Sequence, residues 1–166
     1  MNKFRSFETI TIFLILILII FFYTEYFLPQ EDAAILFRYA ENLFRTGEIT
    51  YNLEGVKTEG ATDFLWMILL AFLNNIYFNT FFWSVVINII SLVILSIKFI
   101  KFFKLKKIYA YIFFTSHLFI PFAWGAALVG FSVFLVELIL FLTIIFFDKE
   151  KTFKFLFFSF LGCLIR

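Results

Sequence analysis

The feature that most constrains this chain is a run without any charged residue from Thr80 to Ile97. About 20 apolar residues in a helix are enough to cross the hydrocarbon core of a bilayer. The run is not isolated, because 63% of the 166 residues are hydrophobic, 30 are phenylalanine and only 16% are charged. Soluble domains carry about 25% charged residues. We therefore expect lipid, rather than water, to surround most of the chain.

The apolar segments predict an all-α fold, a polytopic transmembrane helix bundle. We predict five spans, at about 7–27, 79–103, 108–124, 126–147 and 152–166. The segment 121–130 contains Pro and Gly, which mark helix ends, and predicts a hairpin between the third and fourth spans. The long loop at about 28–78 is expected to carry juxtamembrane helices on the exoplasmic side.

Charge distribution sets the predicted orientation. The apolar run Phe64 to Leu73 has only 10 residues, which suits an interfacial or re-entrant helix better than a crossing. If it does not cross, the lysines from Lys98 to Lys107 lie on the same side as Lys3 and Arg5, which is the cytoplasm by the positive-inside rule. The segment 25–63, with eight of the 12 acids, then lies outside. We expect a multi-pass membrane protein with its N-terminus in the cytoplasm.

The exoplasmic loop is expected to begin with a surface helix that starts near Asp32, after Pro29, and ends at Gly47. Its apolar positions repeat at helical spacing, at Leu36, Phe37, Ala40, Leu43 and Phe44. The polar positions expected on the opposite face are Arg38, Glu41, Asn42 and Arg45. Asp32 has two open interpretations, an N-cap of this helix or a functional carboxylate. Thr62 or Asp63 would cap the next helix.

With these residues placed, a family resemblance becomes visible. The stretch EDAAILFRYAENL at 31–43 resembles the signature D/E-D-A-x-I-x-F-R-Y-A-x-N-L of bacterial GT-C membrane glycosyltransferases, in particular the arabinofuranosyltransferase-like group. The resemblance continues through Gly47 and the Tyr-Asn pair at 51–52. It ends with EGATDFLW at 59–66, which is similar to the motif E-G-x-T-S/D-F-L-W of that group. In all it covers about 36 residues.

The resemblance implies a glycosyltransferase that uses a polyprenyl-phosphate sugar as donor and transfers the sugar with inversion. An acid at the start of the first exoplasmic loop acts as general base in that superfamily, so Glu31 and Asp32 are the catalytic candidates. Arg38 or Lys57 could stabilise the leaving phosphate. The further pocket candidates are Tyr39, Asn52, Glu59 and Thr62.

The implied partners are a lipid-linked sugar donor, a glycan, lipid or protein acceptor, and membrane lipids. The sequence contains no metal-ligand cluster and no nucleic-acid signature, so we expect no cofactor and no nucleic acid, while a divalent cation stays open.

The chain also departs from the family. Val129 stands where the family motif W-x-x-S-G-L/M-E-T places a glutamate, and the chain ends at Arg166, where a later motif would begin. We therefore expect residues 1–166 to be the N-terminal part of a GT-C transmembrane domain, with the C-terminal half as a partner. The alternative is an inactive or scaffold membrane protein. A small transporter is disfavoured, because it would need paired intramembrane charges along a path, and only Glu137 and His117 are available for that.

Overall fold

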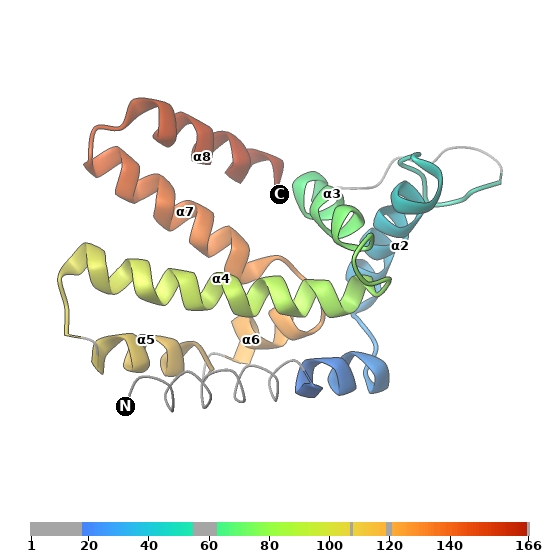
Figure 1. The fold of residues 1–166 in the computed structure, drawn as a ribbon, viewed down its shortest axis with the longest axis horizontal. Helices are drawn as coiled ribbons and strands as arrows, with labels where there is room; N and C mark the ends of the chain where they lie inside the picture. The colour runs from blue at the N-terminus through green and yellow to red at the C-terminus, as the bar shows by residue number, and fades with distance from the viewer. Residues whose placement is uncertain (1–17, 55–62, 107, 119–120, 166) are drawn as a thin grey trace.

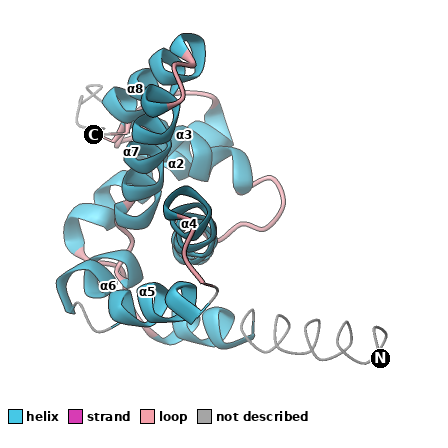
Figure 2. Cartoon of the chain, turned by 90° about the vertical axis from the view of Figure 1, so that its left-hand side faces the viewer, coloured by secondary structure: helices cyan, strands magenta, loops and turns pink. Residues whose placement is uncertain are grey.

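The computed structural model describes residues 18–54, 63–106, 108–118 and 121–165. Within these ranges the chain forms helices joined by turns and contains no strand (Figure 2), so the predicted all-α class is confirmed. A helical stretch at 18–26 comes first. The helices that follow are α2 (Glu31–Thr46), α3 (Phe64–Leu73), α4 (Thr80–Phe103), α5 (Ile108–Leu118), α6 (Pro121–Leu128), α7 (Val133–Asp148) and α8 (Thr152–Leu164).

The longest of these helices, α4, runs through the middle of the molecule. Figure 2 looks along it, with α2, α3, α7 and α8 on one side and α5 and α6 on the other. Its 24 residues rise about 36 Å, more than the roughly 30 Å of a bilayer core. The Asn79 side chain caps the helix by accepting a hydrogen bond from the Phe82 N–H at 2.8 Å.

Only α4, among the described residues, is long and apolar enough to cross a membrane by length and composition. Its bounds agree with the span predicted at 79–103. The other predicted spans coincide with the helical stretch at 18–26, with α5 and α6 together, with α7 and with α8, which are shorter helices within the described ranges. The multi-pass arrangement therefore stays a prediction.

Two clusters of buried apolar side chains hold the helices together. The larger cluster joins α2, α3 and the N-terminal half of α4, and Trp66, Met67 and Leu70 at its centre are fully buried. The smaller cluster joins α4 to α6 and α7 and consists of Leu92, Leu95, Ala127, Phe134 and Leu138. Both α4 and, through Ile139, α7 contribute to the two clusters, so these two helices connect them.

The loop helices follow the local sequence pattern. Gly47 ends α2 in the left-handed region with φ 74°, as predicted. The helix α3 has the bounds of the apolar run, Phe64–Leu73, and its ten residues rise only about 15 Å. Figure 1 shows α2 and α3 side by side at the N-terminal end of α4. Asp63 occupies the N-cap position of α3 without a side-chain capping hydrogen bond.

The predicted hairpin at 121–130 is wrong over most of its length. Pro121–Leu128 forms helix α6, and the chain reverses at 129–132. Proline suits the first turn of a helix, where the missing N–H would have no helical partner, so Pro121 starts α6 instead of marking a turn. Gly130 has a φ of 114°, a conformation that glycine adopts without strain, so the reversal occurs there.

Candidate functional site

The candidate catalytic acids lie at the start of α2. Gln30 occupies the N-cap position with an extended backbone, and Glu31 and Asp32 belong to the first helical turn, where both are exposed. The interpretation of Asp32 as the N-cap is therefore wrong. Carboxylates in the first turn interact favourably with the positive end of the helix dipole, so both side chains suit this place as anions.

Asp32 lines a pocket of about 380 Å³. The pocket lies between the start of α2, the start of α3 and the turn that joins α6 to α7. A second carboxylate in its lining is Asp63, which directly precedes α3, whereas Glu31 is not among the lining residues. The remaining walls are formed by Ala33, Ile35, Leu36, Trp66, Gly130 and Phe131. Two distant segments of the resemblance thus contribute one carboxylate each to the same hollow.

The turn that forms one wall of this pocket is fixed by hydrogen bonds from three other parts of the fold. Three consecutive carbonyls accept one bond each. The pairs are the Gln30 N–H to Val129 at 3.1 Å, the Trp66 indole N–H to Gly130 at 3.1 Å, and the Asn88 amide to Phe131 at 2.7 Å. Asn88 also accepts a bond from the Phe134 N–H at 3.0 Å. The pocket wall is therefore held in one geometry by the residue before α2, by α3 and by α4.

Gly130 lets this turn approach α2 closely. A Cβ atom at this position would lie 2.6 Å from the ring of Phe37 and 3.0 Å from the Cβ of Ala33. Both distances are shorter than the roughly 3.5–4.0 Å of a carbon–carbon contact. The close contact between α2 and the turn therefore depends on a residue without a side chain.

Arg38, a candidate for phosphate binding, lines a different pocket. This pocket of about 370 Å³ also includes Glu25, Glu41 and Thr80, and it shares no residue with the Asp32 pocket. The Thr80 hydroxyl donates a hydrogen bond to Glu41 Oε1 at 3.3 Å. The structure therefore places Arg38 next to acids on another side of α2 and does not bring it to the pocket that contains Asp32.

Two polar residues of α2 connect the helix to the segment that follows it. Tyr39 is 3% exposed, and its ring centroid lies 5.8 Å from that of Tyr51. Asn42 is buried, and its side-chain amide donates to the carbonyls of Thr50 and Tyr51 at 2.8 and 2.9 Å. The prediction that Asn42 lies on the exposed face is therefore wrong. Asn52 is exposed in the same segment and does not line the Asp32 pocket.

The candidates Lys57, Glu59 and Thr62 lie outside the described residues. The next residue, Asp63, is expected from the sequence only as a helix cap, and its place in the pocket is not predicted. The signal that could have identified it is its position inside the second motif of the resemblance, EGATDFLW at 59–66.

The pocket has groups that suit the recognition of hydroxyls. Carboxylates accept hydrogen bonds from hydroxyl groups, and a carboxylate within reach of a hydroxyl can take its proton. In the part of the chain that the structure describes, no group of three or more His, Cys, Asp and Glu side chains is placed to hold a metal ion. Comparisons with protein-family models, with curated proteins and with solved structures found no match.

Proposed function

We propose that this chain is part of a membrane glycosyltransferase that moves a sugar from a polyprenyl-phosphate donor to an exoplasmic glycan, lipid or protein. The observation that carries the proposal is the pocket that contains both Asp32 and Asp63. Each carboxylate belongs to a different segment of the resemblance to GT-C transferases. A shared substrate site requires such separate segments to converge on one concave surface.

The proposed reaction needs one carboxylate as general base. The carboxylate takes the proton of the acceptor hydroxyl while the hydroxyl oxygen attacks the anomeric carbon of the donor sugar. The bond from that carbon to the phosphate oxygen breaks on the opposite face. The configuration at the anomeric carbon is therefore inverted, and polyprenyl phosphate leaves. We assign the base to Asp32 rather than Glu31 because Asp32 lines the pocket. Asp63 then orients the acceptor through a second hydrogen bond.

Negative charge on the leaving phosphate calls for a cation in the transition state. Lys57, which lies outside the described residues, stays a sequence-based candidate for this cation. Arg38 lines the neighbouring pocket, so it would act only on a donor phosphate that extends around α2.

The surface of the helices supports a membrane setting. No residue of α8 is buried, and Phe153, Leu156 and Phe160 are 82%, 58% and 60% exposed. A contiguous apolar surface of this kind is unfavourable in water and is expected where a helix contacts lipid. We propose a multi-pass protein of a bacterial cytoplasmic membrane with a cytoplasmic N-terminus. The lysines from Lys98 onward are at the end of α4 away from α2 and α3 (Figure 1), in keeping with that orientation.

The test is donor turnover in membranes of cells that express the protein from its native gene, with cells lacking the gene as blank. Polyprenyl-phosphate arabinofuranose and polyprenyl-phosphate mannose serve as donors, and release of polyprenyl phosphate is measured. We expect Asp32→Asn to lower the rate by about 100-fold or more, because the base is lost. The matched control is Glu54→Gln, which removes an exposed carboxylate of the same loop and should leave the rate unchanged.

Each outcome of this assay separates the candidates. Unchanged turnover in Asp32→Asn together with a loss in Glu31→Gln would transfer the role of base to Glu31. Full turnover in both variants would remove the loop carboxylates from the mechanism. If the protein is present in the membrane and neither donor is turned over, the alternative of an inactive or scaffold membrane protein is favoured.

A further inference from the structure

A pocket of about 400 Å³ lies between the C-terminal ends of α4 and α7, and its lining combines charged and apolar residues. The basic residues are Lys98, Lys101, Lys104 and Lys149, and the one acid is Asp148, which leaves a formal charge of +3. The apolar residues are Phe102, Leu142, Ile145 and Phe146. A ligand that fits both sets carries a negative charge beside an apolar part.

The pocket arises because α4 and α7 diverge. They contact each other at the start of α7, where the Phe134 N–H bonds to Asn88, and they separate toward Lys104 and Lys149, which follow the two helices (Figure 1). Both helices end with partly negative carbonyl groups, so the positive charge of the pocket comes from the lysine side chains and not from helix dipoles. On the apolar side, the rings of Phe102 and Phe141 meet edge to face at 5.7 Å.

We propose that this pocket binds the phosphate group of an anionic phospholipid, with the acyl chains along its apolar wall. Basic pockets between membrane helices on the cytoplasmic side bind acidic lipid headgroups. A lysine suits this role because its ammonium group attracts phosphate while its carbon stem packs along apolar surface. The inference rests on the membrane setting of the proposed function and is independent of the transferase reaction.

Lysines at cytoplasmic helix ends also orient a membrane protein without binding a ligand. The chain offers a comparison, because Lys106, Lys151 and Lys154 belong to the same basic segments but do not line this pocket. Lys154 lies at the edge of the pocket, with Nζ 5.4 Å from the ring centroid of the lining residue Phe146, but it is not itself a lining residue. If orientation were the whole role of the lysines, the two sets would behave alike.

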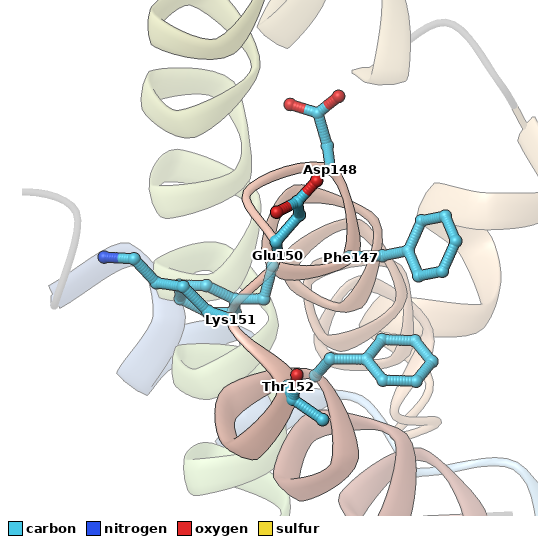
Figure 3. Close-up of a pocket in the computed structure, with 7 residues that line it drawn as sticks. Phe147, Asp148, Glu150, Lys151 and Thr152 are labelled. Carbon is cyan, nitrogen blue, oxygen red and sulfur yellow. The ribbon is translucent and has the colours of Figure 1, made fainter.

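A neighbouring hollow of about 580 Å³ at the turn between α7 and α8 lacks this combination (Figure 3). Its charged residues are Asp148, Glu150 and Lys151, so acids outnumber bases. Figure 3 shows the amine of Lys151 and the ring of Phe147 on opposite sides of the turn. The phosphate site is therefore assigned to the pocket between α4 and α7.

The test is the thermal unfolding midpoint of the purified protein in an uncharged detergent, with added cardiolipin, phosphatidylcholine or inorganic phosphate. A ligand that binds only the folded state raises the midpoint. We expect cardiolipin at about ten times its Kd to raise it by roughly 4 °C, and the other two additions to leave it unchanged. The triple variant Lys98→Gln, Lys101→Gln, Lys149→Gln should lose the shift. The matched control Lys106→Gln, Lys151→Gln, Lys154→Gln removes the same charge and should keep it.

An equal loss of the shift in both triple variants would overturn the proposal, because total charge would then explain the effect. A shift with inorganic phosphate as large as that with cardiolipin would assign the pocket to a water-borne phosphate and overturn the lipid assignment. If the first triple variant does not fold, arginine at the same three positions must retain the shift. The readout does not require sugar transfer, so its result and that of the turnover assay are separate.

Discussion

The two halves of α4 are held in place by different interactions. In the N-terminal half, polar side chains bond to other elements: Asn88 bonds to the Phe131 carbonyl and the Phe134 N–H, and the Thr80 hydroxyl donates to Glu41. In the C-terminal half, apolar side chains pack against other helices, as in the cluster around Leu92 and Leu95 and the stacked rings of Phe99 and Phe113 at 4.3 Å. Hydrogen bonds fix distance and angle, whereas ring contacts tolerate small shifts. We therefore expect the N-terminal half of α4 to tolerate less displacement than the C-terminal half, which carries Lys98 and Lys101.

The largest loss of stability is expected from Gly130→Ala, which changes the turn bonded to the N-terminal half of α4. The new Cβ would overlap the ring of Phe37, and the φ of 114° would be strained. We expect the free energy of unfolding to fall by about 3 kcal/mol or more, measured as the thermal midpoint in detergent. Gly125→Ala is the control, because no atom lies within 4 Å of its Cβ and it sits inside α6. That substitution should leave stability unchanged or raise it slightly, and equal losses in both variants would contradict the role given to Gly130.

A smaller loss is expected from Asn88→Leu. This change removes the bonds of the Asn88 side chain to the partly buried Phe131 carbonyl and to the buried Phe134 N–H. We expect a loss of about 2 kcal/mol in the free energy of unfolding. The control on the same helix is Ser96→Ala, since the buried Ser96 hydroxyl donates only to the Leu92 carbonyl of α4 itself. A change within about 0.5 kcal/mol is expected there. Similar losses at Asn88 and Ser96 would show that the two halves do not differ.

The smallest of the three effects is expected from Trp66→Phe. The substitution keeps an aromatic ring in the core and removes the indole N–H that donates to Gly130. We expect a loss of about 1 kcal/mol and a lower donor turnover, because the pocket wall loses one of its fixed points. Trp83→Phe serves as control, since its indole bonds to the Tyr77 carbonyl in an exposed place. If Trp83→Phe lowers turnover as much as Trp66→Phe, the bond to Gly130 has no special part in the pocket.

Helices that depend on their own sequence pattern could be predicted. The apolar run Phe64–Leu73, the end of α2 at Gly47 and the helix from Thr80 all appear in the structure as expected, because periodicity, a helix-ending glycine and an apolar run are local properties. The position of Pro121 could not be decided in this way, since proline both ends helices and starts them. Asn42 was placed wrongly because its burial depends on carbonyls of a later segment.

The candidate site was predicted only in part. Asp32 was a candidate from the sequence, and the structure gives it a pocket, but Asp63, Gly130 and Asn88 were not recognised. Asn88 lies in a run that the sequence showed only as apolar, and its bond to Phe134 crosses 46 positions of the chain. The bond from Trp66 to Gly130 crosses 64 positions. No local pattern carries such contacts, because they depend on how the helices are arranged in space.

The three carbonyls at 129–131 have a further consequence for the order in which the protein is made. Synthesis proceeds from the N-terminus, so Gln30, Trp66 and Asn88 leave the ribosome before any of the carbonyls they bond to. These three donors are therefore made before their acceptors, and the rest of α4, α5 and α6 are synthesised in between. This wall of the pocket can therefore form only after the turn at 129–131 has been made, late in the synthesis of residues 1–166.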